Sequence, residues 1–297
     1  MRKPDAGPDR DGRTVPADHA SADALLITAL YVAFTGLLWA VLGWWLSAGA
    51  HALVVTVLLT LRRAPQSLAT ALLPLVLLTP LYVETGHLSE IIWAGRTFDA
   101  EMLALDDALF GRSPALWLSE VAPWYGLSEL LHVCYASFWI VVPGIALELH
   151  RQGRARDRDA CVLAVTATFL TCFLAFMTVP VNGPRGVFPP LDPHLHGPFL
   201  RLCHAVLEGG AATRAAFPSG HVAVMMVCAA CTRRWLRPLY PLVAALGVGV
   251  AVCTVYGRFH YAVDALAGLF VAWRLTGTFE RLIFTVGDPA AATTEPG

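Results

Sequence analysis

The chain has 297 residues, of which 56% are hydrophobic and 14% are charged, with a formal net charge of −1. Soluble domains carry about 25% charged residues, so this composition excludes an ordinary water-soluble globule and predicts a polytopic membrane protein. The near-neutral charge gives no argument for a nucleic-acid partner. Lys3 is the only lysine, so a site for an anionic group has to be built from arginine and histidine.

The N-terminal part contains three predicted membrane crossings. Residues 1–22 are polar and rich in Asp, Arg, Pro and Gly, which predicts a disordered tail and not a cleaved signal peptide. Residues 22–61 are apolar over about 40 positions, enough for two crossings of about 20 residues each. Residues 66–83 form the third predicted crossing.

The segment 84–124 differs from its surroundings because charged residues are interspersed with Phe, Leu and Trp. It is too polar to cross a membrane and too apolar to be a free loop. We expect amphipathic helices that lie on the outer membrane surface.

The rest of the chain predicts five more crossings, which makes about eight in an all-α polytopic membrane helix bundle. These five cover residues 125–148, about 160–180, 218–232, 238–257 and 260–278. A Pro- and Gly-rich external segment, 181–216, precedes the sixth crossing. No internal repeat is visible, so residues 23–280 are expected to form one integral membrane domain.

Basic clusters determine the predicted orientation. They follow crossings two, four and six, at Arg62-Arg63, at 150–158 and at 233–237. Because cytoplasmic loops are enriched in Lys and Arg, all three clusters are expected in the cytoplasm. Both termini, including a tail over 281–297, are then cytoplasmic. The sequence thus predicts a multi-pass plasma membrane protein whose segment 181–216 faces the outside or periplasm.

The run from Phe217 to His221 begins the sixth crossing with Pro, Ser and Gly. Proline at the first helical position loses no hydrogen bond, and a helix N-terminus attracts anions. The amides of Ser219, Gly220 and His221 are therefore expected to form an outward-facing anion site.

A second polar pair, His260 and Asp264, lies at the outer end of the eighth crossing. Four residues separate the two, so on a helix they share one face and the carboxylate can hold one imidazole nitrogen. An unpaired carboxylate inside an apolar helix is costly, which makes His260 the expected partner of Asp264. Ionisable groups at these positions predict a functional site.

The strings FPSGH and TVYGRFHYAVDALAG, in this order, resemble the second and third motifs of the type 2 phosphatidic acid phosphatase superfamily, which also includes vanadium haloperoxidases. The form HYAVD, with VNGPRG upstream, is most similar to the inositol phosphorylceramide synthase branch. The resemblance covers residues from about 125 to about 275. It implies a six-helix phosphatase core behind additional N-terminal crossings.

The resemblance also implies a role for each motif residue. His260 would attack phosphorus and form a phosphohistidine, with Asp264 orienting its ring. His221 would act as general acid and base. Ser219 and Gly220 would bind phosphate oxygens. The sequence offers no carboxylate cluster for Mg²⁺, so neither a metal nor another cofactor is expected.

Two departures from the family's motifs affect the phosphate-binding residues. The first motif is Lys-x6-Arg-Pro in the family; here Arg185 is present, but Thr178 stands at the lysine position. The third motif usually has an arginine where this chain has Thr254. We expect Arg258, one turn later, to supply that guanidinium. Arg214 and Thr254 are further candidates for phosphate contact.

The sequence predicts a membrane-embedded lipid phosphate phosphatase that works through a phosphohistidine at the outer face. If an alcohol replaces water as acceptor, the same site makes a phosphotransferase that moves a phospho-head group between lipids or to a polyol. A polyprenyl phosphate or diphosphate is also a compatible substrate. A transporter is the remote alternative, since transporters place charges near the midplane and contain repeats, whereas here the polar residues gather at one face. Neither the lipid nor the oligomeric state follows from the sequence.

Overall fold

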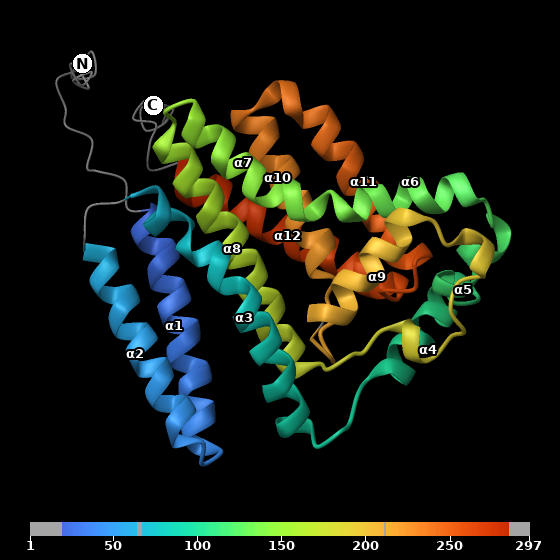
Figure 1. Cartoon of the computed structure of the whole chain (residues 1–297), viewed down its shortest axis with the longest axis horizontal. Coiled ribbons are helices and arrows are strands. Elements are labelled where there is room, and N and C mark those ends of the chain that lie inside the picture. Colours follow the sequence, from blue (N-terminus) through green and yellow to red (C-terminus); the bar gives the residue numbers. More distant parts are fainter. Residues whose placement is uncertain (1–19, 64–66, 211, 285–297) are drawn as a thin grey trace, which may run out of the picture.

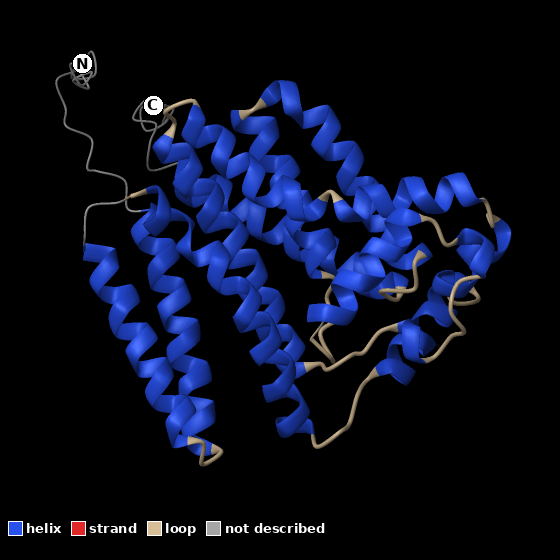
Figure 2. Cartoon of the chain, viewed as in Figure 1, coloured by secondary structure: helices blue, strands red, loops and turns tan. Residues whose placement is uncertain are grey.

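The computed structural model describes residues 20–63, 67–210 and 212–284, and in this part of the chain the fold consists of helices joined by loops, with no strand beyond an isolated bridge (Figure 2). The predicted all-α class is confirmed. Most of the two predicted tails lies outside the described residues. The first helix begins at Ala20 and the last helix ends at Phe284, slightly beyond the predicted domain limits of 23 and 280.

The first two helices, α1 (Ala20–Val41) and α2 (Trp45–Arg63), form a hairpin at one edge of the molecule (Figure 1). Gly43 makes the turn at φ 84°, a left-handed value that glycine adopts without steric cost. Helix α1 packs against both α2 and α8 (Ala155–Thr178), whereas α2 buries a single residue, Leu58. Helix α2 is therefore peripheral.

Helix α3 (Leu68–Trp93) runs beside α8 and is longer than the sequence predicts, because residues 84–93 continue it instead of starting a separate surface helix. The polar residues in this extension have partners on α8. Ser89 Oγ and Trp93 Nε1 donate hydrogen bonds of 3.1 and 2.8 Å to successive carbonyls in the last turn of α8. These carbonyls have no intrahelical partner, which explains why the extension stays helical and packed.

Four of the helices that follow α3 cover one end of the bundle, and a fifth, α7, packs against α8 and α10. They are α4 (Asp99–Phe110) and α5 (Pro114–Val121), then α6 (Tyr125–Ala136) and α7 (Phe138–Arg151), and later α9 (Pro198–Gly210). Helix α4 packs against α12, α5 against α11, and α9 against α6. In Figure 1, α4, α5, α6 and α9 lie at the opposite side of the molecule from the α1–α2 hairpin, whereas α7 lies across the top of the bundle beside α8 and α10.

The C-terminal helices α10 (Gly220–Trp235), α11 (Tyr240–Tyr256) and α12 (Ala262–Phe284) complete the bundle. Helix α10 is central and contacts α7, α8, α11 and α12. Its approach to α12 is close, because a Cβ added to Gly268 would lie 2.5 Å from the carbonyl oxygen of Ser219. Small residues allow such contacts between membrane helices, where the hydrophobic effect gives little drive for association.

Within the described residues, six segments are long and apolar enough to cross a membrane: α1, α2, α3, residues 125–151, α8 and residues 237–256. The protein is thus a multi-pass membrane protein. The remaining two predicted crossings correspond to α10, which has 16 residues, and to α12, whose first turn contains the buried Asp264.

Candidate active site

The start of α10 differs in one respect from the sequence prediction. The helix begins at Gly220, and Ser219, not Pro218, ends the preceding loop as the N-cap, with its Oγ accepting a hydrogen bond of 3.4 Å from Val222 N. Serine is a favoured N-cap because its side chain accepts this bond, which explains why the helix begins after Pro218. The Ser219 amide does not face outward, since it donates to the carbonyl of Asp264 at 2.9 Å.

Two amides of the predicted anion site remain open. Gly220 and His221 occupy the first two helical positions, whose N–H groups have no intrahelical acceptor. Both residues line a cavity that also contains His260 and is described below. The anion site at α10 therefore consists of these two amides, and Ser219 supports it as the cap.

His260 lies in the loop before α12, and Asp264 is the third residue of that helix. The two residues do not share a helix face as predicted, because the loop turns sharply where the Thr254 carbonyl accepts hydrogen bonds from the amides of Phe259 and His260, at 2.9 and 2.8 Å. The pair still forms. His260 Nδ1 lies 3.5 Å from Asp264 Oδ2, and the same oxygen accepts a 2.9 Å bond from Tyr261 N.

His221 is brought to His260, with 6.3 Å between the two ring centroids. Its ring stacks on Tyr135 at 4.8 Å and contacts Phe138 at 4.5 Å. The Tyr135 hydroxyl lies 3.2 Å from His221 Nε2. These contacts hold the His221 ring in place beside the His260 ring.

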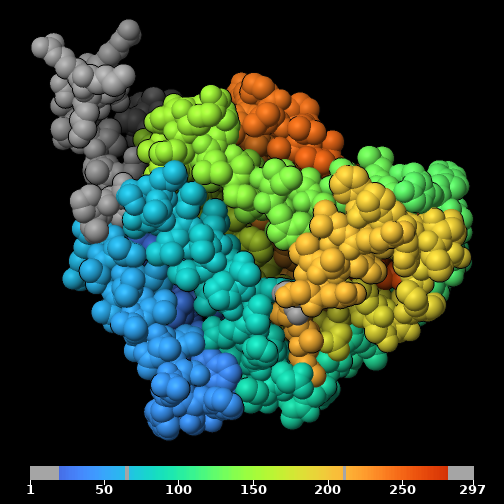
Figure 3. Space-filling view, viewed as in Figure 1, coloured from blue at the N-terminus to red at the C-terminus, as the bar shows by residue number. Residues whose placement is uncertain are grey.

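A cavity of about 480 Å³ contains both histidines at its polar end. Arg185 and Asn182 line the same end, and the remaining wall is mostly apolar. This apolar wall comes from α3, α6, α7, α8 and α9, with Leu72, Leu75, Leu78, Tyr82, Phe138, Trp139, Val142, Phe169, Phe173, Phe176, Val206 and Leu207 among its residues. Figure 3 shows the surface hollowed between the teal α3, the green α6 and α7 and the gold α9.

Arg185 belongs to a short 3₁₀ turn, Pro184–Gly186, and its guanidinium lies 5.6 Å from the Phe259 ring centroid. The loop reaches this position through Gly183, whose φ is 87°. A Cβ at Gly183 would lie 2.6 Å from the Phe259 carbonyl oxygen, so only glycine permits this approach. Arg185 is therefore the predicted arginine that the structure brings to the histidines.

The structure does not bring Arg258 to the cavity. Its guanidinium donates to the carbonyls of Pro189 and Pro190 and, at 3.0 Å, to Ser119 Oγ. Helix α11 ends before Arg258, whose φ is 59°, and this turn directs its guanidinium toward the loop at Pro189 and not into the cavity.

The two further candidates for phosphate contact, Arg214 and Thr254, also make their contacts away from the cavity. Arg214 forms an ion pair of 2.5 Å with Glu90 and donates to carbonyls after the end of α3. Thr254 Oγ1 donates to the Ala251 carbonyl at 2.8 Å, and the Thr254 carbonyl closes the turn before His260. Neither residue lines the cavity described above.

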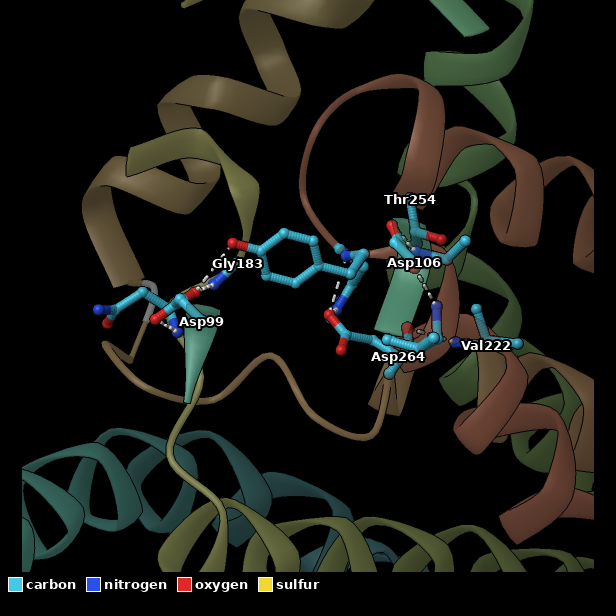
Figure 4. Close-up of polar contacts among 12 residues, drawn as sticks. Asp99, Asp106, Gly183, Val222, Thr254 and Asp264 are labelled. Carbon is cyan, nitrogen blue, oxygen red and sulfur yellow. Dashed lines mark hydrogen bonds and ion pairs between the residues drawn. The ribbon is translucent and has the colours of Figure 1, made fainter. Parts of the chain in front are cut away.

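Two carboxylates that the sequence assigned to the outer surface reach the site (Figure 4). Asp99 accepts hydrogen bonds from the amides of Asn182 and Gly183, at 3.1 and 2.9 Å, and from Tyr261 Oη at 3.4 Å. Asp106 is fully buried and binds the first amides of α12. Asp99 and Asp106 were visible in the sequence as acidic residues in a largely apolar segment, and a buried carboxylate needs hydrogen-bond donors. The donors lie far away in the chain, so the sequence did not identify them.

Burial lowers the pKa of His260 to about 4, and the nearby charge of Arg185 acts in the same direction, with the Ala216 backbone opposing. Only 5% of His260 is exposed, which accounts for the large effect of desolvation. The ring is therefore neutral near pH 7. A neutral imidazole has the free electron pair that a nucleophile requires.

A sequence model of the PAP2 superfamily matches residues 100–277, which is more than half of the chain. The chain therefore belongs to the PAP2 superfamily. The matched range includes His221, His260 and Asp264 and excludes α1, α2 and α3. No significant match was found among curated proteins or among solved structures. Members of the superfamily include phosphatases and phosphotransferases, which supports an enzymatic role in phosphoryl transfer for this protein.

Proposed function

We propose that the protein is a membrane-embedded lipid phosphate phosphatase that works through a phosphohistidine at His260. One observation carries the proposal: a single cavity joins His221, His260 and Arg185 to a long apolar wall. A lipid phosphate is the ligand whose two ends match these two parts. The phosphate would lie among the cationic and N–H groups, and the tail would lie against α3, α7 and α8.

In the first half of the reaction, Nε2 of His260 attacks phosphorus, because Nδ1 faces Asp264 at 3.5 Å. The bond between phosphorus and the lipid oxygen breaks as the P–N bond forms. His221 enters this step as an imidazolium ion, donates its proton to the departing oxygen and becomes neutral, so the lipid leaves as an alcohol. Asp264 stabilises the positive charge that develops on the His260 ring.

In the second half, water attacks phosphorus from the side of His221, which takes the water's proton. The P–N bond breaks, and phosphate leaves with His260 neutral again. Arg185 and the amides of Gly220 and His221 stabilise the charge on the phosphoryl oxygens in both halves, as positioned donors do in a water-poor site. Neither half requires oxidation or reduction.

We also propose that the site faces outside the plasma membrane with both termini in the cytoplasm. The basic ends of α2, α7 and α10 support this orientation, since cytoplasmic ends of membrane helices are enriched in arginine. Among these ends, α10 carries Arg233 and Arg234 in its last turn and the site in its first turn.

The test is a phosphate-release screen across lipid phosphates in detergent, with the wild type and His260→Ala compared on each. We expect release by the wild type, inhibition by vanadate, and loss of release in His260→Ala. Normal release by His260→Ala would contradict the proposal.

A second arm of the screen adds a polyol or a hydroxyl-bearing lipid. Transfer of the head group in place of phosphate release would make the protein a phosphotransferase, the alternative supported by its similarity to the inositol phosphorylceramide synthase branch. Full biological activity of His260→Ala would instead favour a non-enzymatic transporter.

A further inference from the structure

Asp99 and Asp106 each accept three hydrogen bonds near the site, and Asp106 is the more buried of the two. Asp106 lies in α4, is fully buried, and accepts hydrogen bonds at both carboxylate oxygens. Oδ1 accepts from Val263 N at 3.0 Å, and Oδ2 accepts from Ala262 N at 3.2 Å and from Ser113 Oγ at 3.0 Å. Three donors from two distant parts of the chain therefore converge on one side chain.

These contacts fix the beginning of α12. Its first amides have no intrahelical acceptor, so their direction depends on what binds them. Asp264 binds the preceding amide, Tyr261 N, at 2.9 Å, and Asp106 binds the next two. The three consecutive amides after His260 are thus held by two carboxylates.

We propose that Asp106 is a positioning residue for the His260–Asp264 pair, an inference that rests on the proposed function. By holding the amides of Ala262 and Val263, it sets where α12 begins and therefore where the Asp264 carboxylate lies relative to His260 Nδ1. Asp106 does not touch the cavity, so it acts through Asp264 and His260 and not on the substrate.

The arrangement specifically requires a carboxylate. An ionised carboxyl group only accepts hydrogen bonds, and here all three neighbours are donors. In Asp106→Asn the side-chain NH2 group, itself a donor, would point at one of the two backbone N–H groups. One hydrogen bond to α12 is then lost, although the side-chain volume is nearly unchanged. The negative charge also lies at the positive end of the α12 dipole, which favours it.

The neighbouring Asp107 provides a matched control because it is exposed, whereas Asp106 is fully buried. We expect Asp106→Asn to lower kcat by up to about 100-fold, the size of effect that a misplacement of about 1 Å at the reacting group produces. KM should stay within about twofold of the wild type, because Asp106 is not a cavity residue. Asp107→Asn should leave both constants unchanged.

Vanadate affinity separates positioning from mere stability. Vanadate mimics the phosphoryl group and binds the attacking nitrogen, so in the folded variant a misaligned His260 should bind it more weakly by a factor similar to the loss of kcat, whatever the change in melting temperature. Ser113→Ala provides a second variant, which removes one donor and leaves the two amides bound; we expect a smaller loss in the same two quantities.

The inference is overturned if folded Asp106→Asn retains wild-type kcat and vanadate affinity. If Asp106→Asn does not fold, wild-type values in Ser113→Ala overturn it instead. Vanadate binding measured by calorimetry, without substrate, keeps this failure apart from failure of the proposed function. A wild type that releases no phosphate but binds vanadate in an Asp106-dependent way would refute the phosphatase and retain the positioning role.

Discussion

Helices α10 and α12 begin side by side, and their first turns differ in what binds the free amides. At α12, carboxylates from Asp106 and Asp264 take the amides of Tyr261, Ala262 and Val263. At α10, the Ser219 side chain takes only Val222 N, and the first two amides belong to residues that line the cavity. The two N-termini are linked, since Ser219 N donates to the Asp264 carbonyl at 2.9 Å.

This difference assigns different tasks to two similar structures. A helix N-terminus carries a partial positive charge and unpaired donors, and it binds whichever anion is nearest. At α12 the anions are built into the protein, so the turn is rigid and holds His260. At α10 the protein supplies no anion of its own, so the turn is available for a phosphate. One site can therefore hold a nucleophile and an anionic substrate within a few ångströms without the two competing for the same donors.

The largest effect should come from removing the charge that α12 holds next to His260. We expect Asp264→Asn to lower kcat by roughly 10²- to 10⁴-fold, because the amide can still accept from Tyr261 N but no longer stabilises a cationic imidazole ring. Single-turnover phosphate release measures the chemical step directly. A loss below about threefold would show that the carboxylate is dispensable and that the comparison of the two turns is wrong.

Arg185 tests the α10 side of the comparison, with Arg258 as its control. Arg185→Ala should lower kcat/KM by roughly 10²- to 10³-fold, since a positioned donor to the phosphoryl group is lost. Arg258→Ala should instead lower the melting temperature, because the carbonyls of Pro189 and Pro190 lose their donor, and should leave kcat nearly unchanged. If Arg258→Ala lost as much kcat as Arg185→Ala, the sequence-based role of Arg258 would be restored.

A smaller effect should follow from separating the two helices. Gly268→Ala would place a methyl group 2.5 Å from the Ser219 carbonyl, so α10 must shift at its first turn. We expect destabilisation of roughly 1–3 kcal/mol together with reduced phosphate release. Gly277→Ala in the same helix has open space and should change neither quantity. Equal behaviour of the two variants in thermal unfolding and activity would argue against a tight contact between the turns.

Local helix geometry was enough to predict that the amides of Gly220 and His221 lie in the first turn of α10, but not that the Ser219 amide binds the Asp264 carbonyl or that His260 lies before α12. FPSGH lies within one turn, so the positions of His221 and the open amides follow from local helix geometry. Arg258 does not reach the cavity, because it lies in a turn at φ 59° after the end of α11 and its guanidinium is bound by the carbonyls of Pro189 and Pro190. Its distance from Thr254 in the sequence therefore says little about the direction of its side chain.

The role of Asp106 could not be predicted from the sequence for a different reason. It lies 156 residues before Ala262, whose amide it binds, and no local pattern connects the two. In an amphipathic segment, an acidic residue is expected to face water, so the sequence predicts the same exposed position for Asp106 as for its neighbour Asp107. Only the packing of α4 against α12 distinguishes the two acids.

The smallest predicted effect concerns the charge state of His260, and it connects the two turns. Burial and the charge of Arg185 together keep the pKa of His260 at about 4, below the usual value of about 6.5. The ring should therefore remain neutral as pH falls through 6 and 5, and it should become protonated, and lose its nucleophilic electron pair, only near pH 4. Removing the positive charge in Arg185→Ala should raise this pKa, because protonating His260 then no longer brings two cations together, whereas burial is unchanged and continues to hold the pKa down.

Histidine-selective NMR in detergent measures the titration of His260 without substrate, so the ionisation of a lipid phosphate does not contribute. The variant His260→Gln assigns the signal. A wild-type midpoint near 6.5 that does not move in Arg185→Ala would mean that water reaches the ring freely, and the cavity could then not provide the low-dielectric environment in which the amides of α10 and the charge of Arg185 act on phosphate.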